Sequence, residues 1–271
     1  MGGSAQDYFQ AATRNEAVVL DRLFGRWFAT KVPEQPMVAA GQRIYAIGDI
    51  HGRADLLEQL IAMIEADDAA RGDAEILLIF LGDLIDRGPD SAGVVERVGQ
   101  LLSAGDQVRL IKGNHEEVFA AAATGCSKST RLLMKIGGYE TLESYGISRA
   151  EADEGTMQDL ADLLKQRIPQ AHLAILNRGE DMVRSGDYVF VHAGIRPGVI
   201  LDQQKPSDLR WIRGPFLDVR RRDPFVVVHG HTPTEAVEFL PDRIGIDTGA
   251  CYSGKLTALG LEGTERWVLQ T

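Results

Sequence analysis

Five short apolar runs in this chain each lead directly into a polar segment rich in aspartate, histidine and asparagine. Each run has the length of a β-strand, and the carboxyl ends of parallel strands meet at one edge of an open α/β sheet. The polar segments are therefore predicted to converge in space although they lie far apart in the chain. They are Gly48-Asp-Ile-His-Gly52, Gly82-Asp-Leu-Ile-Asp-Arg-Gly88, Gly113-Asn-His-Glu116, His192, and His229-Gly-His-Thr232.

The residues between these motifs predict alternating strands and helices. Residues 44–47, 75–81 and 108–111 are predicted strands, and the second of them is apolar on both faces, as in a buried strand. Apolar residues at helical spacing follow the first two motifs, which predicts a helix after each strand. Residues 117–180 break this rhythm and predict a helical insertion beside the site. Near the C-terminus, residues 236–239, 243–246, 255–260 and 266–269 predict a meander of short strands.

The N-terminal part has a different character. Residues 7–28 predict an amphipathic helix that packs on the main domain, and residues 31–41, with two prolines, predict a linker. We therefore divide the chain into an N-terminal helix and linker over residues 1–42 and one large domain over residues 43–271, with the helical insertion at about 117–180.

The composition excludes some classes of function. The chain has 271 residues, of which 44% are apolar, enough for a sizeable core. Its formal net charge of −10 argues against binding to a nucleic acid polymer, which depends on basic patches. No run is long and apolar enough to suggest a membrane span, and the N-terminus lacks an export signal pattern. Two widely spaced cysteines favour a reducing compartment, so we expect a cytoplasmic protein.

The side chains in the motifs suit a pair of divalent cations. Carboxylate, amide and imidazole groups are hard or borderline ligands, and a carboxylate such as that of Asp83 has two oxygens with which to bridge two ions. Two such ions lower the pKa of a shared water and clamp a phosphoryl group. The predicted metal ligands are Asp49, His51, Asp83, Asn114, His192 and His231.

Other motif residues fit the remaining needs of phosphoester hydrolysis. The leaving group requires a proton, and His115, oriented by Asp86, is the predicted catalytic pair. Arg87 and Arg213 are predicted to bind the substrate phosphate, since a guanidinium offers a planar fork of donors. Glu116 is expected to brace the start of a helix, whereas Asp247 is expected to have a structural role in a turn.

With these motifs in this order, the chain resembles the calcineurin-like metallophosphoesterases. Within that family it is most similar to the small bacterial and phage phosphoprotein phosphatases, over about residues 43–260. The resemblance implies a four-layer α/β/β/α sandwich of two mixed sheets and a dimetal site, often of manganese, with iron or zinc as alternatives. It assigns the first metal to Asp49, His51 and Asp83, and the second to Asp83, Asn114, His192 and His231.

The resemblance also implies His115 with Asp86 as the acid pair, and Arg87 with Arg213 as the phosphate clamp. Two departures bear on the substrate. Nuclease and phosphodiesterase branches commonly end their last motif with a second histidine, where this chain has Pro233. Symmetrical diadenosine tetraphosphate hydrolases typically lack the aspartate that this chain keeps at Asp86. Both favour a phosphomonoesterase acting on phosphoproteins or other phosphorylated molecules.

Two alternatives remain open from the sequence. One is hydrolysis of dinucleoside tetraphosphates by the same site. The other is a non-catalytic binding module that keeps the fold, although the presence of every predicted ligand and of His115 argues against it.

Overall fold

The computed structural model describes residues 33–271, so the helix predicted for residues 7–28 lies outside the described residues. The described end of the predicted linker is packed against the domain. The main chain of Met37 accepts a hydrogen bond from the N–H of Asp187 and donates one to its carboxylate, and Val38 is buried. The domain division at residue 42 stays a prediction.

The first sheet is mixed and has the strand order β10-β9-β1-β2-β3. Strands β1, β2 and β3 run parallel to one another. On the other side of β1, β9 pairs antiparallel with β1, and β10 pairs antiparallel with β9. The parallel strands are connected by the helices α2 and α3. The elements are β1 (Gln42–Ile47), α2 (Ala54–Arg71), β2 (Glu75–Phe80), α3 (Ser91–Ser103), β3 (Val108–Leu110), β9 (Thr257–Glu262) and β10 (Glu265–Gln270).

The second sheet is also mixed, with the order β4-β5-β6-β8-β7. Here β5, β6 and β8 run parallel, and β4 and β7 pair antiparallel at the two edges. The elements are β4 (Val183–Ser185), β5 (Tyr188–Phe190), β6 (Val226–His229), β7 (Glu238–Phe239) and β8 (Arg243–Gly245).

One expectation about strands was wrong. The C-terminal strands do not form one meander: β7 and β8 belong to the second sheet, and β9 and β10 to the first. The connection that carries α12 (Ala250–Ser253) crosses between the sheets, a choice that apolar alternation does not encode. Strand β2 is covered on both faces, as predicted. Leu78 and Phe80 pack with the helices on its outer face, and Ile79 packs between the sheets, whereas its first three residues are more exposed.

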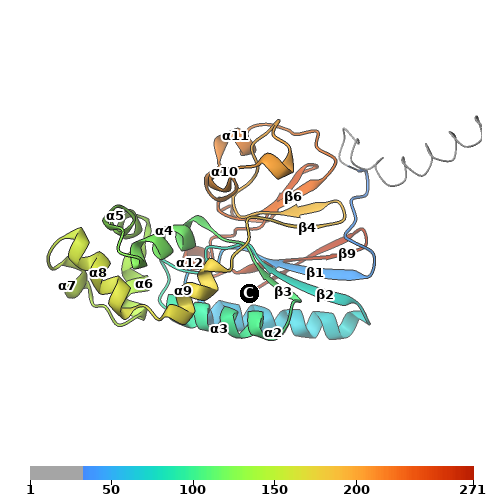
Figure 1. Ribbon diagram of the computed structural model, residues 1–271. Coiled ribbons are helices and arrows are strands. Elements are labelled where there is room, and N and C mark those ends of the chain that lie inside the picture. The colour runs from blue at the N-terminus through green and yellow to red at the C-terminus, as the bar shows by residue number, and fades with distance from the viewer. Residues whose placement is uncertain (1–32) are drawn as a thin grey trace, which may run out of the picture.

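Three apolar clusters separate four layers, which confirms the predicted sandwich (Figure 1). One cluster joins α2 and α3 to the outer face of the first sheet, and the second lies between the sheets. The third covers the outer face of the second sheet with two short helices and a 3-10 turn. These are η2 (Leu201–Gln203), α10 (Pro206–Trp211) and α11 (Gly214–Leu217).

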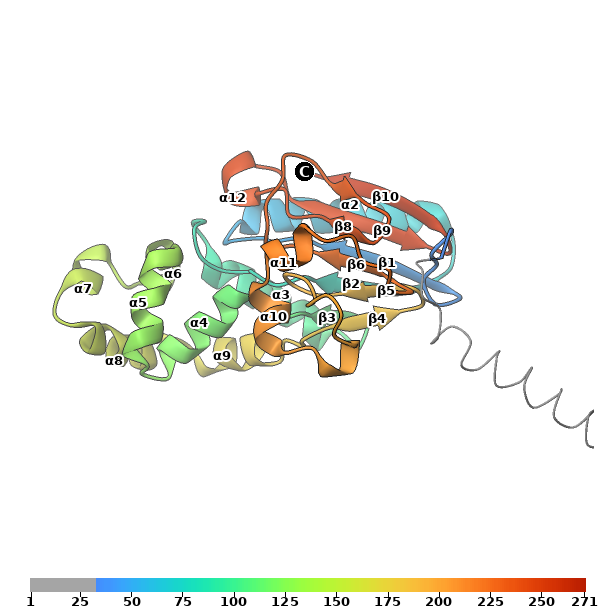
Figure 2. The ribbon, with the colours of Figure 1, turned by 90° about the horizontal axis from the view of Figure 1, so that it is seen from above.

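Between β3 and β4 the chain forms a run of helices, which lie at one end of the sandwich (Figures 1 and 2). They pack on one another and on α3 through the apolar cluster of the first sheet's outer face. They are α4 (Asn114–Ala123), α5 (Ser127–Ile136), α6 (Gly138–Ser144), α7 (Arg149–Asp153), α8 (Met157–Arg167) and α9 (Gln170–Asn177). None of the helices in residues 33–271 is long and apolar enough to cross a membrane.

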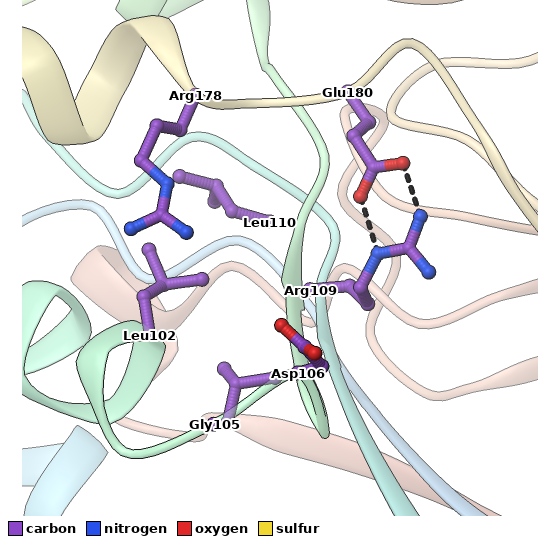
Figure 3. Close-up of a pocket in the computed structure, with 8 residues that line it drawn as sticks. Leu102, Gly105, Asp106, Arg109, Leu110, Arg178 and Glu180 are labelled. Atoms are coloured by element: carbon purple, nitrogen blue, oxygen red, sulfur yellow. Dashed lines mark hydrogen bonds and ion pairs between the residues drawn. The ribbon is translucent and has the colours of Figure 1, made fainter.

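The end of this helical run is tied back to the edge of the first sheet. The side chains of Glu180 and Arg109 of β3 make two hydrogen bonds with each other (Figure 3). Both residues line a pocket of about 250 Å³. The main chain of Glu180 also bonds to Leu110 and Lys112 on either side of Ile111. The insertion is therefore anchored at both ends, since α4 begins directly after the motif that follows β3.

Candidate metal centre

The loops after the strands have unusual backbone conformations at the predicted site residues. Within residues 33–271, the non-glycine residues with φ in the left-handed region are His51, Asp83, Asp86, Arg87 and His231, with φ between 47° and 73°. L-residues adopt this region at a cost, and such residues concentrate at functional sites. All five belong to the residues singled out from the sequence, so the strain and the predicted chemistry coincide.

Asp83 lies at the centre of two groups of buried potential metal ligands. Its carboxylate joins His51 and His115 in one group, and His192 and His231 in the other, with ligand atoms within 4.8 Å of one another in each. Asp83 Oδ2 lies 3.7 Å from His51 Nε2, and Oδ1 lies 3.4 Å from His192 Nε2. One carboxylate shared by two groups is the arrangement expected of a ligand that bridges two ions.

The imidazoles are oriented as metal ligands usually are. Nδ1 of His51 donates to the carbonyl of Ile85 at 2.7 Å, and Nδ1 of His192 donates to that of Leu81 at 2.8 Å. These bonds leave Nε2 of each ring facing the site, as backbone carbonyls commonly do for metal-bound histidines. Nε2 of His231 is buried without a hydrogen-bond partner. The donor set therefore fits divalent cations.

Asn114 and Asp49 complete the predicted set from other directions. Asn114 Oδ1 lies 3.0 Å from His192 Nε2, on the side of the second group. The carboxylate of Asp49 accepts the backbone N–H of His231, at 3.0 Å to Oδ2. A Cβ at Gly230 would lie 2.0 Å from Asp49 Oδ1, so this approach requires glycine. Asp49 thus adjoins the site, although its oxygens are in neither group of three.

The electrostatics of the buried histidines differ from ring to ring. Burial lowers the pKa of His51 and of His231 to about 3, so both are neutral and able to bind metal. Burial also acts against the charged form of His192, but the charge of Asp83 and a hydrogen bond to it outweigh burial and raise its pKa to about 10. A cation that binds His192 has to displace this proton.

His115 and Asp86 form a close pair beside the two groups. Nδ1 of His115 lies 2.6 Å from Asp86 Oδ2, and both side chains are buried. Burial lowers the pKa of His115, yet the charge of Asp83 and the hydrogen bond that Nδ1 donates to Asp86 outweigh it, so this pKa is raised. Because Nδ1 donates to Asp86, this carboxylate is the partner that orients the imidazole.

Two arginines flank the site. Nη1 of Arg87 lies 2.7 Å from His51 Nε2, and Nη2 lies 3.0 Å from His115 Nε2, so its guanidinium spans the two rings. Arg213 is exposed, and its Nη1 donates to Thr232 Oγ1 at 3.3 Å, directly after His231. The structure therefore brings all ten predicted site residues to one end of the strands.

The comparisons with known proteins agree with this geometry. Residues 42–257 match the family model described as calcineurin-like phosphoesterase. The chain belongs to the calcineurin-like phosphoesterases. It is 30% identical over 223 residues to serine/threonine-protein phosphatase 1 of Salmonella typhimurium, which covers 80% of this chain and 90% of that protein.

Other relatives of this phosphoesterase carry a different substrate in their names. The chain is 30% identical over 234 residues to an asymmetrical bis(5'-nucleosyl)-tetraphosphatase of Anoxybacillus flavithermus, with 79% of this chain and 88% of that protein covered. A solved structure of a protein proposed to be a diadenosine tetraphosphatase aligns with a TM-score of 0.57 at 22% identity, over 87% of this chain and 98% of that one. Its likeness supports the fold. The chain is thus a phosphoester hydrolase, and the names of its relatives point to two different substrates.

Asp247, which was expected to have only a structural role in a turn, also interacts electrostatically with the site. Asp247 does accept the N–H of Gly249 at 2.9 Å, as a turn residue would. However, Asp247 is buried. The pKa of Asp49 is raised well above its ordinary value, first by the burial of Asp49 itself and next by the charge of Asp247. A signal was present in the sequence, since Asp247 directly follows an apolar run, as the other site motifs do.

Glu116 braces the loop that carries Asp83, as expected. Its Oε2 accepts the N–H groups of Asp83 at 2.9 Å and Gly113 at 2.8 Å, and its Oε1 accepts that of Leu84 at 2.8 Å. These three bonds fix the strained loop between β2 and α3 to the start of α4. The carboxylate is fully buried and acts on the main chain.

Replacing Glu116 by glutamine is expected to lower the free energy of unfolding by about 2 kcal/mol, because an amide NH₂ would face a buried N–H donor. Urea denaturation of the metal-free protein measures this change. Glu117→Gln, at the next position of α4 and only partly buried, is the matched control and should change stability by less than about 0.5 kcal/mol. Equal losses in the two variants would contradict the bracing role.

Proposed function

We propose that this phosphoesterase hydrolyses phosphoserine and phosphothreonine in proteins, with two divalent cations, manganese in the first instance, as cofactors. The carboxylate, amide and imidazole donors around Asp83 support cations of this kind, including iron and zinc. The proposed ligands are Asp49, His51, Asp83, Asn114, His192 and His231. When bound, the two ions would supply an activated water and neutralise phosphoryl charge.

The observation that carries the proposal is the 2.6 Å contact between His115 Nδ1 and Asp86 Oδ2. When the P–O bond of a serine or threonine phosphate breaks, the side-chain oxygen leaves as an alkoxide, which is strongly basic and needs a proton in the transition state. Hydrolysis of a dinucleoside tetraphosphate releases a nucleotide phosphate as the leaving group. This group is far less basic than an alkoxide and has little need of an acid. A buried imidazole held in its cationic form therefore favours the phosphomonoester.

The arginines have the complementary task of binding the phosphate. Arg87 places its two Nη groups beside His51 and His115, and Arg213 lies beside Thr232, directly after His231. Two guanidinium groups can hold the phosphoryl oxygens while His115 stays next to the leaving oxygen. With cations held by the proposed ligands, the activated water would be supplied by the metals and the proton for the leaving group by His115.

Hydrolysis of dinucleoside tetraphosphates is the second candidate, because several relatives carry that activity in their names. We also propose a cytoplasmic location. Cys126 and Cys251 are both free thiols, which suits a reducing compartment.

The purified protein, loaded with manganese, should be tested on a phosphoserine peptide, p-nitrophenyl phosphate and diadenosine tetraphosphate. We expect kcat/KM for the peptide to exceed that for the dinucleotide by at least about tenfold, since only the peptide uses the acid fully. Excess chelator should abolish all turnover. A preference for the dinucleotide would transfer the proposal to the second candidate, and full activity in chelator would refute the metal-dependent reaction.

A further inference from the structure

The helical insertion places a buried hydroxyl against the proposed acid pair. Thr141 lies on α6 and has no solvent exposure. Its Oγ1 donates to Asp86 Oδ1 at 2.6 Å and accepts the N–H of Asp86 at 2.9 Å. Because the single hydroxyl proton of Thr141 is used on Asp86, the 2.9 Å contact with Ser91 Oγ has Ser91 as its donor. The hydroxyl of Thr141 thus donates one hydrogen bond and accepts two, all within one network around Asp86.

The network fixes how Asp86 faces His115. One carboxylate oxygen, Oδ1, is held by Thr141, and the other, Oδ2, contacts His115 Nδ1. Rotation of the carboxylate would break both contacts at once. The Thr141 hydroxyl therefore determines the direction in which Asp86 presents Oδ2 to the imidazole.

The same segment of the insertion also contacts Arg87. The N–H of Arg87 donates to the carbonyl of Gly137 at 2.8 Å, and its Nε donates to that of Ile136 at 3.3 Å. Gly137 has φ of 113°, and a Cβ there would lie 2.6 Å from Arg87 Cγ. A glycine is therefore needed where the insertion meets the arginine.

These contacts explain how a strained pair of residues is maintained. Asp86 and Arg87 are consecutive non-glycine residues in the left-handed region, with φ of 73° and 69°. Such a pair persists only when its surroundings determine it. The N–H of each is bonded to the segment from Ile136 to Thr141, with Ser91 adding a second acceptor for Asp86.

We propose that Thr141 is a positioning residue for the His115–Asp86 pair, so that the insertion takes part in catalysis rather than only covering one end of the sandwich. The inference rests on the proposed function, because it assumes that His115 protonates the leaving group. It predicts that loss of the hydroxyl weakens proton delivery and leaves the binding of the phosphate largely intact.

The test compares two phosphomonoesters whose leaving groups differ in basicity. In manganese-loaded Thr141→Val, kcat for phenyl phosphate should fall by about tenfold, and kcat for p-nitrophenyl phosphate by less than about threefold, because the less basic leaving group depends less on the acid. KM should stay within about twofold, and Thr141→Ser should restore both rates. Thr141→Ala replaces the valine variant if that variant does not fold.

Ser144→Ala is the matched control. Ser144 is also on α6, but its hydroxyl bonds to the carbonyl of Thr141 and the N–H of Ala92, away from Asp86. Its rates on both substrates should be unchanged. Equal losses on the two substrates in Thr141→Val, or no loss on either, would overturn the inference.

A second readout needs no metal and no turnover. In the metal-free protein the short His115–Asp86 hydrogen bond should give a proton resonance far downfield, which Ser144→Ala keeps and Thr141→Val shifts or loses. An unchanged resonance in Thr141→Val would also overturn the inference. Because both substrates are artificial monoesters, the comparison stays valid if the wild-type protein proves not to prefer phosphopeptides, so failure of the proposed function is separately visible.

Discussion

Asp83→Asn is expected to abolish phosphoester hydrolysis, with kcat/KM lower by at least about a thousandfold. Asp83 is the one residue present in both groups of potential ligands that the described residues form. An asparagine has one oxygen in place of two and no charge, so it cannot bridge two cations. The variant would hold neither cation in its productive position, and the loss of both would remove several kcal/mol of transition-state stabilisation.

Rates on p-nitrophenyl phosphate and metal analysis of the purified variant measure this effect together. Asp83→Asn should retain less of both cations, whereas the wild-type protein retains them. Asp67→Asn serves as the matched control. Asp67 accepts hydrogen bonds from Tyr45 of β1 and Trp267 of β10 and contacts none of the proposed ligands, so the activity of this variant should be unchanged. Normal turnover by Asp83→Asn would eliminate the bridging role.

The convergence of the site could be predicted from the sequence because its logic is local. Each motif follows a strand. Strands β1, β2 and β3 run parallel in the first sheet, as β5 and β6 do in the second, so within each sheet the carboxyl ends share an edge. Residue types then identify the chemistry, since aspartate and histidine directly after buried strands are costly unless they bind something. This argument brings Asp49 and Asp83 together. His192 follows a strand of the second sheet, so its approach depends on how the two sheets pack, which only the family resemblance implied.

The parts that could not be predicted depend on contacts with no local signature. Thr141 looks like any polar residue of a short helix, and its bonds to Asp86 span 55 residues of sequence. The allocation of the C-terminal strands to two different sheets also has no local signature, because apolar residues such as Leu259 and Leu261 would suit either sheet. Backbone strain at Asp86 and Arg87 is likewise set by the insertion that supports it.

His115→Asn should lower kcat on a phosphoserine peptide by about 10²–10⁴-fold, which is the usual contribution of a general acid. The fall on p-nitrophenyl phosphate should be smaller, because its leaving group needs less protonation. The variant tests a real alternative, since His115 Nε2 lies 3.8 Å from Asp83 Oδ2 and belongs to one of the two groups of potential ligands.

Metal analysis separates the two roles. If His115 is the acid, the variant keeps both cations and loses rate according to the basicity of the leaving group. If His115 is a ligand, the variant loses one cation and slows equally on every substrate. Combining His115→Asn with Thr141→Val then connects the acid to the insertion. In the proposal Thr141 affects proton delivery through Asp86 and His115, so its removal should cost little further rate once the imidazole is gone.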